Sequence, residues 1–218
     1  QVVRAVVPMH TFGHPVDIEA LMAVCSRWQL AVVEDAAESL GSTLRGRHTG
    51  TCARFGILSF NGNKVITTGG GGMVLCQSEA DADRAKHLTT TAKKHHAYEF
   101  DHDEPGFNFR MPNLNAALGC AQMESLPVFL QRKRELASAY QHFLTDSDLQ
   151  FVVEPAAARS NYWLNAVIAP DAEARQRLLQ ETNACGVMTR PVWKLMHHLP
   201  MFAGDLRGDL TNSEWLEG

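Results

Sequence analysis

The sequence predicts an α/β protein built on a mostly parallel sheet that helices cover on both faces. Apolar runs alternate with segments of helical periodicity over the first two thirds of the 218-residue chain. Hydrophobic residues make up 45% of the sequence, which is enough for a real core. The pattern changes near residues 145–148, and the tail is typical of a small α+β unit. We therefore expect a large α/β domain over residues 1–147 and a small α+β domain over residues 148–218.

The elements of the large domain follow from local patterns. Apolar residues at helical spacing predict a helix over Asp17–Trp28, which Asp17 can cap. A second helix begins at Ser78, with acids in its first turns, where the helix dipole favours them. Short buried strands are expected at Val2–Val7, Leu30–Val33, Phe55–Phe60 and Met73–Cys76.

The second half of the chain begins with a long helical segment. It runs from Asn113 to about Leu144, and we expect a break at Pro127, because proline removes a backbone donor and clashes with the preceding turn. Strands are expected at Phe151–Val153 and Tyr162–Ile168. A final helix over Ala172–Cys185 is closed by Gly186, a typical C-cap residue.

Charge and composition argue against several classes of protein. The 20 Lys and Arg residues against 24 Asp and Glu residues, for a net charge of −4, give no sign of binding to nucleic acid or to a membrane surface. No apolar run reaches about 18 residues, and no signal peptide is visible. The five cysteines are an odd number without a CxxC pair, so we expect no disulfide framework and a reducing cytoplasm. The chain opens on Gln1, inside a strand-like run and without Met, so we expect a fragment.

Two charged residues stand where an α/β sheet collects its ligands. Asp35 follows a buried strand, and a carboxylate there can hold a proton on a heterocyclic nitrogen, although a helix cap or loop acid is the commoner role. Lys64 follows the strand near residue 60, and a lysine in a dry pocket can attack a carbonyl as the neutral amine, although most lysines lie on the surface. The glycine run Gly69–Gly72 does not fit a phosphate-binding GxxxxGK[ST] loop, and spacing alone favours a flexible turn.

The histidines give no metal-binding pattern. His10 and His14 are four residues apart, but Gly13 and Pro15 break any helix between them. The adjacent pair His197 and His198 should point apart, as should the pair at residues 95–96. We therefore expect no metal site.

Three ordered motifs, taken together, resemble one family. The segments Val33–Gly41, Phe55–Met73 and Gly106–Asn113 resemble the DegT/DnrJ/EryC1/StrS aminotransferases, which are pyridoxal phosphate (PLP) enzymes of fold type I acting on nucleotide sugars. Arg190–Trp193, with His197, is similar to the family's C-terminal segment. The resemblance is nearest to the branch that makes 4-amino sugars for legionaminic acid and related bacterial glycans.

The resemblance implies a role for each matching residue. Lys64 would be the catalytic Schiff-base lysine, Asp35 the partner of the pyridinium nitrogen and Ser59 a ligand of the cofactor phosphate. Glu38 stands near the cofactor's phenolic oxygen, where relatives often carry Gln or His, and a Glu would have to be protonated to donate there.

Other residues are implied to act on the substrate or across a dimer. Asn108 would reach the cofactor phosphate in the neighbouring subunit, and Arg110 the sugar nucleotide there, so that each site needs a homodimer. His197 would bind substrate.

The resemblance also implies the reaction. Transamination from L-glutamate to a nucleotide-linked keto-deoxysugar, of the UDP-4-keto-6-deoxy-HexNAc type, is expected. Relatives carry further motifs before the residue that is first here, and we expect the chain to lack them. The alternatives are a non-catalytic relative that folds and binds nucleotide or a partner subunit, and a sugar 3-dehydratase, which typically carries His in place of Lys64.

Overall fold

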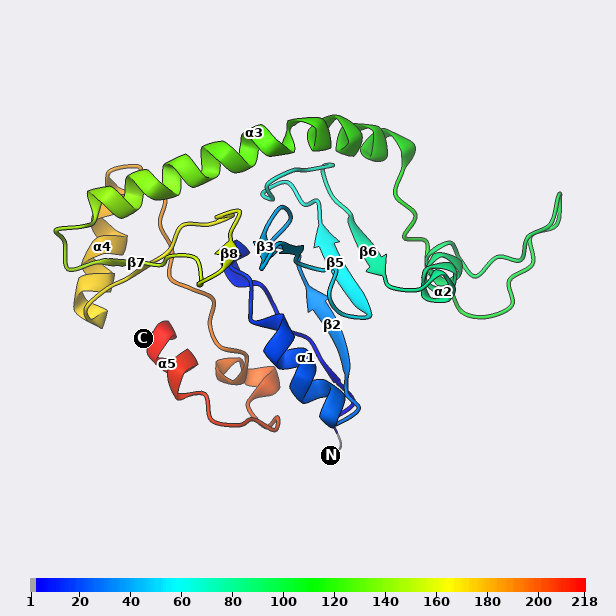
Figure 1. Cartoon of the computed structure of the whole chain (residues 1–218), viewed down its shortest axis with the longest axis horizontal. Helices are drawn as coiled ribbons and strands as arrows, with labels where there is room; N and C mark the ends of the chain where they lie inside the picture. The colour runs from blue at the N-terminus through cyan, green and yellow to red at the C-terminus, as the bar shows by residue number, and fades with distance from the viewer. Residues whose placement is uncertain (1–2) are drawn as a thin grey trace. The chain divides into compact units, whose positions relative to one another are not determined.

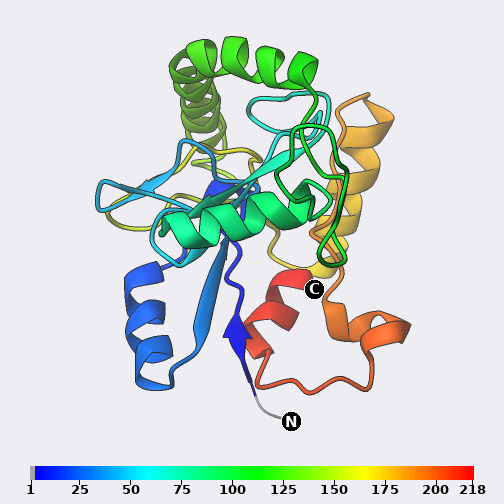
Figure 2. The same ribbon diagram turned by 90° about the vertical axis from the view of Figure 1, so that its right-hand side faces the viewer.

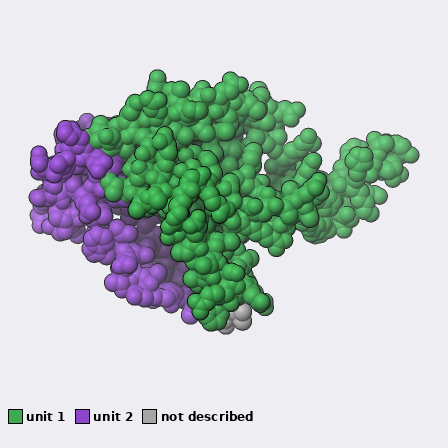
Figure 3. All heavy atoms as spheres, viewed as in Figure 1, with its two compact units in different colours: residues 1–139, 153–165 green, residues 140–152, 166–218 purple. Residues whose placement is uncertain are grey.

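The computed structural model describes residues 3–218, so Val2 of the expected strand Val2–Val7 lies outside the described residues. The chain forms two compact units (Figure 3). Unit 1 contains Gln1–Ala139 and Val153–Asn165, and unit 2 contains Tyr140–Val152 and Ala166–Gly218. These units alternate along the sequence, and the domain division expected after residue 147 stays a prediction.

Unit 1 contains a four-stranded sheet in the order β1-β2-β5-β6 (Figure 1). Strands β1, β2 and β5 pair in parallel, and β6 is antiparallel to β5, which confirms the mostly parallel sheet expected from the sequence. The first expected strand is much shorter than its apolar run, because only two of its residues pair with β2. The strands span Ala5–Val6 (β1), Ala31–Asp35 (β2), Phe55–Ser59 (β5) and Gly72–Cys76 (β6).

Both expected helices of this region form, and each begins at the expected cap. Helix α1 (Ile18–Arg27) begins after Asp17, whose Oδ1 accepts the Ala20 N–H at 3.3 Å. Helix α2 (Glu79–Thr89) begins after Ser78, whose hydroxyl oxygen accepts the N–H of the third helical residue at 3.2 Å. Helix α1 lies beside β2 (Figures 1 and 2) and buries its apolar residues Ile18 and Cys25 in a core that includes Val32.

A second, three-stranded sheet has no counterpart in the sequence prediction. Its order is β4-β3-β8, with antiparallel pairing throughout. Each strand is two residues long, too short for an alternating pattern to show. The strands are Thr43–Leu44 (β3), Arg47–His48 (β4) and Ala158–Arg159 (β8). A short 3-10 turn, η1 (Thr11–Gly13), precedes α1.

Helix α3 (Asn113–Phe143) is continuous, so the expected break at Pro127 is wrong. The helix changes direction along its length instead (Figure 2). Leu126, next to the proline, is buried with Leu58 and Ile66, and Phe129 and Leu130 pack on the same cluster. Burying such side chains contributes about 1.5–3 kcal/mol each, which together exceeds the roughly 3 kcal/mol cost of an internal proline.

Unit 2 is smaller and has a two-stranded antiparallel sheet of β7 (Gln150–Phe151) and β9 (Val167–Ile168). The expected strand Tyr162–Ile168 is therefore mostly wrong, since Tyr162 has a left-handed backbone with φ 45°. The final expected helix is confirmed as α4, and Gly186 follows it with φ 78°. The helices and turns are α4 (Ala172–Ala184), η2 (Met196–His198), η3 (Pro200–Phe202) and α5 (Thr211–Glu217).

Residues 3–218 contain no helix that combines the length and the apolarity needed to cross a membrane.

Candidate active site

The candidate site lies at the carboxyl ends of β2 and β5 in unit 1. Asp35 is the last residue of β2 and Ser59 the last residue of β5. Because these two strands are parallel neighbours, both residues stand at the same edge of the sheet, where α/β proteins bind their ligands. The Asp35 N–H donates to Pro8 O at 2.9 Å, and its Oδ1 accepts the Ala37 N–H at 3.1 Å, which together orient the carboxylate.

The residue before this acid, Glu34, is fully buried and holds a loop in place. Its Oε1 accepts the N–H groups of Cys52 and Ala53 at 2.6 and 2.7 Å, and its Oε2 accepts the N–H of Gly50 at 2.9 Å and lies 3.2 Å from His10 Nε2. Burial acts to raise the pKa of Glu34, but these bonds outweigh it, so the pKa lies below its usual value. The carboxylate is therefore a structural anchor that sequence reasoning missed.

Lys64 lies on the loop between β5 and β6, and this loop is closed by backbone hydrogen bonds. Phe60 N donates to Gly71 O and Thr68 N donates to Phe60 O, both at 3.0 Å. Helix α3 supports the loop from one side, because Asn115 Nδ2 donates to Thr68 O at 2.5 Å. The glycine run thus ends a well-bonded loop that holds Lys64 near the sheet edge, and it is not a free turn.

The Lys64 amine lies in a partly dry environment lined by an aromatic ring. Its Nζ lies 3.8 Å from the centroid of the Trp163 ring. Burial lowers the pKa of Lys64, and the negative charges of Glu38 and Asp35 act in the opposite direction. The structure therefore brings three of the residues singled out in the sequence, Lys64, Asp35 and Glu38, into one electrostatic environment.

The contact between Trp163 and Lys64 could not be expected from the sequence, because no local pattern connects residue 163 with residue 64. Its side chain is 5% exposed, and its indole Nε1 donates to Asn63 O at 2.7 Å. Its backbone is held as well: the N–H donates to Asn161 Oδ1 at 2.8 Å, and the carbonyl accepts from Lys133 Nζ at 3.1 Å. These hydrogen bonds thus hold the Trp163 ring in place beside the Lys64 amine.

Glu38 is buried, and its carboxyl and carbonyl groups both accept hydrogen bonds. Its Oε2 accepts the Phe12 N–H at 2.7 Å, and its backbone carbonyl accepts from Asn161 Nδ2 at 2.9 Å. Burial raises the pKa of Glu38, and the bond from Phe12 only partly offsets this effect. The shift is toward the protonated form that a hydrogen-bond donor at this position requires.

Among residues 3–218, the remaining expected residues make no hydrogen bond or ion pair with Asp35, Glu38 or Lys64. The Ser59 hydroxyl faces the loop, and its oxygen accepts the Asn61 N–H at 3.4 Å. Asn108 and Arg110 are exposed, and within residues 3–218 neither makes a hydrogen bond or ion pair with Asp35, Glu38, Ser59 or Lys64. His197 belongs to unit 2 and pairs there with a glutamate.

Comparison with known proteins gives a consistent picture. The sequence profile of the DegT/DnrJ/EryC1/StrS aminotransferase family matches residues 1–217. The chain is 36% identical over 200 residues to the "Putative pyridoxal phosphate-dependent aminotransferase EpsN" of Bacillus subtilis (strain 168), covering 91% of this chain and 51% of that protein. It is also 36% identical over 200 residues to GDP-perosamine synthase of Escherichia coli O157:H7, covering 92% of this chain and 54% of that protein.

The fold has close counterparts among solved structures. The aminotransferase TlmJ from Streptoalloteichus hindustanus superimposes with a TM-score of 0.90 at 29% identity, covering 98% of this chain and 58% of TlmJ. The chain therefore spans about half the length of the curated relatives it matches.

Proposed function

Because this chain belongs to the DegT/DnrJ/EryC1/StrS aminotransferase family, we propose that it carries the lysine-bearing part of a PLP-dependent transaminase acting on a nucleotide-linked keto-deoxysugar, with L-glutamate as amino donor. One observation carries the proposal. The Lys64 amine, whose pKa is lowered by burial, interacts electrostatically with the carboxyl groups of Glu38 and Asp35.

The residues present fit a PLP molecule. Lys64 offers an amine that loses its proton more readily than an exposed lysine, and Asp35 offers an oriented carboxylate in the same environment. When bound, PLP supplies an electron sink that stabilises negative charge at the carbon next to the transferred amino group.

Each side chain then has a chemical task. Lys64, as the neutral amine, would bind the cofactor covalently and would later carry a proton between the substrate carbon that bears the amino group and the C4′ atom of the cofactor. Asp35 would hold the proton on the ring nitrogen of the cofactor. Glu38, in its protonated form, would donate a hydrogen bond to the phenolic oxygen, and Ser59 would donate one to the phosphate.

Asn108 and Arg110 would serve a second copy of the chain. Their exposure, and the lack of bonds to Lys64 noted above, support the proposal that they complete the neighbouring site in a homodimer. Exposed aromatic residues flank Asn108 on both sides, since Phe107 and Phe109 are 55% and 70% exposed and stack with ring centroids 5.1 Å apart. Apolar surface of this kind is typical of an interface.

The substrate proposal is a nucleotide-linked 4-keto-6-deoxysugar, in whose binding His197 would take part. The sequence resemblance favoured a UDP-linked HexNAc. The relatives named GDP-perosamine synthase, at 32–36% identity, support testing a GDP-linked sugar beside it. A conversion assay with L-glutamate and both nucleotide sugars decides between them.

The test of the lysine uses covalent trapping. The protein is mixed with PLP, treated with borohydride and digested, and the peptide carrying the cofactor is identified by mass spectrometry. We expect the cofactor on Lys64 and no visible absorption band in Lys64→Ala. Lys93→Ala is the matched control, because Lys93 Nζ also lies over an aromatic ring, that of Phe100, at 3.7 Å, but outside the site.

A cofactor spread over surface lysines, or a Lys64→Ala protein that labels like the original, contradicts the catalytic proposal. That result favours the alternative of a family member that folds and binds nucleotide or a partner without turnover.

A further inference from the structure

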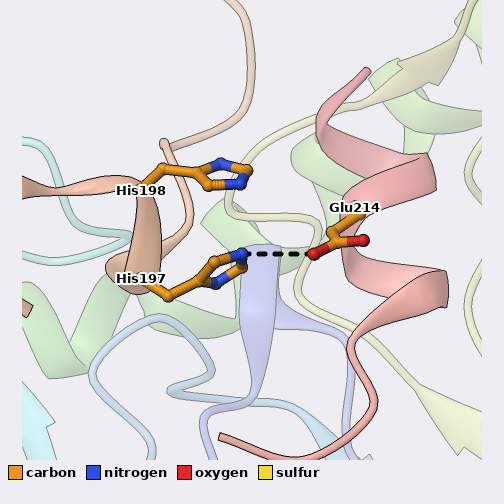
Figure 4. A group of neighbouring side chains, drawn as sticks. All are labelled: His197, His198 and Glu214. Carbon is orange, nitrogen blue, oxygen red and sulfur yellow. Dashed lines mark ion pairs between the residues drawn. The ribbon is translucent and has the colours of Figure 1, made fainter. Parts of the chain in front are cut away.

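Two adjacent histidines and a glutamate meet in unit 2, far along the chain from Asp35, Glu38 and Lys64. His197 and His198 lie on η2, and Glu214 lies on α5 (Figure 4). One ligand atom from each residue lies within 4.8 Å of the others. The two imidazole rings have centroids 4.1 Å apart and an interplanar angle of 56°. The expectation that adjacent histidines point apart is therefore wrong here, because the tight 3-10 turn brings the rings together.

His197 presents a nitrogen that the protein leaves unsatisfied. Its side chain is 10% exposed, and its buried Nε2 has no hydrogen-bond partner among residues 3–218. Glu214 Oε1 lies 3.2 Å from this nitrogen and forms an ion pair with it (Figure 4), but this contact is not a hydrogen bond. A buried nitrogen without a partner costs about 1–3 kcal/mol, so this position is suited to a ligand.

His198 is oriented by a carboxylate in the manner of a metal ligand. Its Nδ1 lies 2.6 Å from Glu217 Oε2, and the other oxygen of Glu217 accepts the Leu195 N–H at 3.2 Å. This arrangement leaves Nε2 of His198 for a further partner. Histidines that bind metals commonly donate their other ring N–H to a carboxylate in this way.

We propose that His197, His198 and Glu214 bind one divalent transition-metal ion of the zinc class. Two imidazoles and a carboxylate suit zinc, whereas magnesium and calcium prefer oxygen ligands alone. Two ligands about 2.0–2.1 Å from a tetrahedral zinc ion are about 3.3 Å apart, close to the 3.2 Å between His197 Nε2 and Glu214 Oε1. Three protein ligands leave the fourth position to water or another small ligand.

A second group of three possible metal ligands, with one histidine and two acids, lacks these features. At His87, Asp103 and Glu104, the Nε2 of the histidine is already 2.7 Å from Asp103 Oδ1, and both oxygens of Glu104 accept from Arg84. Its charges are paired within the chain, so it has no need of an ion. It therefore provides the matched control.

The test measures metal binding by the whole, untagged chain after removal of metals with a chelator. Zinc is titrated by calorimetry, and cobalt(II) is added in its place so that its visible absorption reports four-coordinate geometry. We expect one ion per chain, an intense cobalt spectrum, and loss of both in His197→Ala and His198→Ala. Because Glu217 acts through His198, Glu217→Gln should weaken binding about 10–100-fold.

If a histidine variant fails to fold, Glu214→Gln still tests the proposal. Glu214 is half-exposed, so its replacement removes one metal ligand without disturbing buried packing. We expect this variant to lose the cobalt spectrum, and we expect His87→Ala to keep it. The proposal is overturned if the original protein binds no zinc, if Glu214→Gln binds it unchanged, or if His87→Ala removes it. The three side chains would then form only an ion-paired cluster. None of these outcomes depends on PLP or on transamination.

Discussion

The substitution Glu34→Gln tests whether a buried carboxylate holds the loop beside the sheet edge. Each Glu34 oxygen accepts two donors: Cys52 and Ala53 on Oε1, Gly50 and His10 on Oε2. A glutamine has one oxygen and one NH₂ group, which cannot accept. Whichever way the amide is turned, two buried N–H donors face a donor. At about 1–3 kcal/mol for each unsatisfied group, the expected loss is about 2–6 kcal/mol of the free energy of unfolding.

Urea denaturation followed by circular dichroism measures this loss. Glu173→Gln is the control, since Glu173 is 84% exposed and forms only a surface pair, and it should change the free energy of unfolding by no more than about 0.5 kcal/mol. If Glu34→Gln also stays within about 0.5 kcal/mol, the carboxylate does not anchor the loop and the reasoning fails.

The same substitution changes the pH dependence of stability. The folded-state pKa of Glu34 is lowered, so its contribution is complete above the unfolded-state value of about 4.3 and is lost as the pH falls through the lower, folded-state value. Glu34→Gln should therefore flatten the fall in stability over that acidic range.

Three further outcomes are expected. Because burial lowers its pKa, Lys64 should react with an amine-directed reagent at lower pH than exposed lysines do, and Asp35→Asn, which removes a nearby negative charge, should move that pH lower still; peptide mass spectrometry after labelling at a series of pH values measures both. Gly56→Ala should destabilise the protein by at least about 1–3 kcal/mol in urea, because its Cβ would lie 1.9 Å from a backbone oxygen, whereas Gly62→Ala, with open space around it, should cost little; equal effects would contradict the close packing. Trp163→Phe loses the indole hydrogen bond and should cost about 0.5–1.5 kcal/mol in the same assay, and no loss would mean that this bond does not hold the ring.

Elements with local causes could be predicted from the sequence. Helices α1, α2 and α4 begin where Asp17, Ser78 and Asp171 accept backbone N–H groups, and such caps need only neighbouring residues. Strands β2 and β5 are buried apolar runs, which also show locally. By contrast, the three-stranded sheet β4-β3-β8 and the continuity of α3 through Pro127 depend on packing between distant segments. A local sequence pattern gives no information on such packing.

The residues of the candidate site likewise divide into those that a local sequence pattern reveals and those that only distant contacts reveal. Asp35 and Lys64 could be singled out by their positions after strands, and the roles proposed for them rest on resemblance to a family. Trp163 could not, because its contact with Lys64 joins residues 99 positions apart. The meeting of His197 with His198 was missed because the usual geometry of adjacent side chains does not hold in a tight 3-10 turn.

The order in which the segments of unit 1 occur along the chain bears on its synthesis. Residues 153–165 belong to unit 1 but follow a stretch of unit 2. Ser160 Oγ donates to Gly13 O, 147 residues earlier, and Asn161 N donates to Ser42 Oγ, 119 residues earlier. During translation, unit 1 therefore cannot close until residue 165 has left the ribosome. A chain ending near residue 152 would lack both of these hydrogen bonds and the Trp163 ring that packs beside Lys64. Such nascent chains should therefore be protease-sensitive over the residues that later surround Lys64.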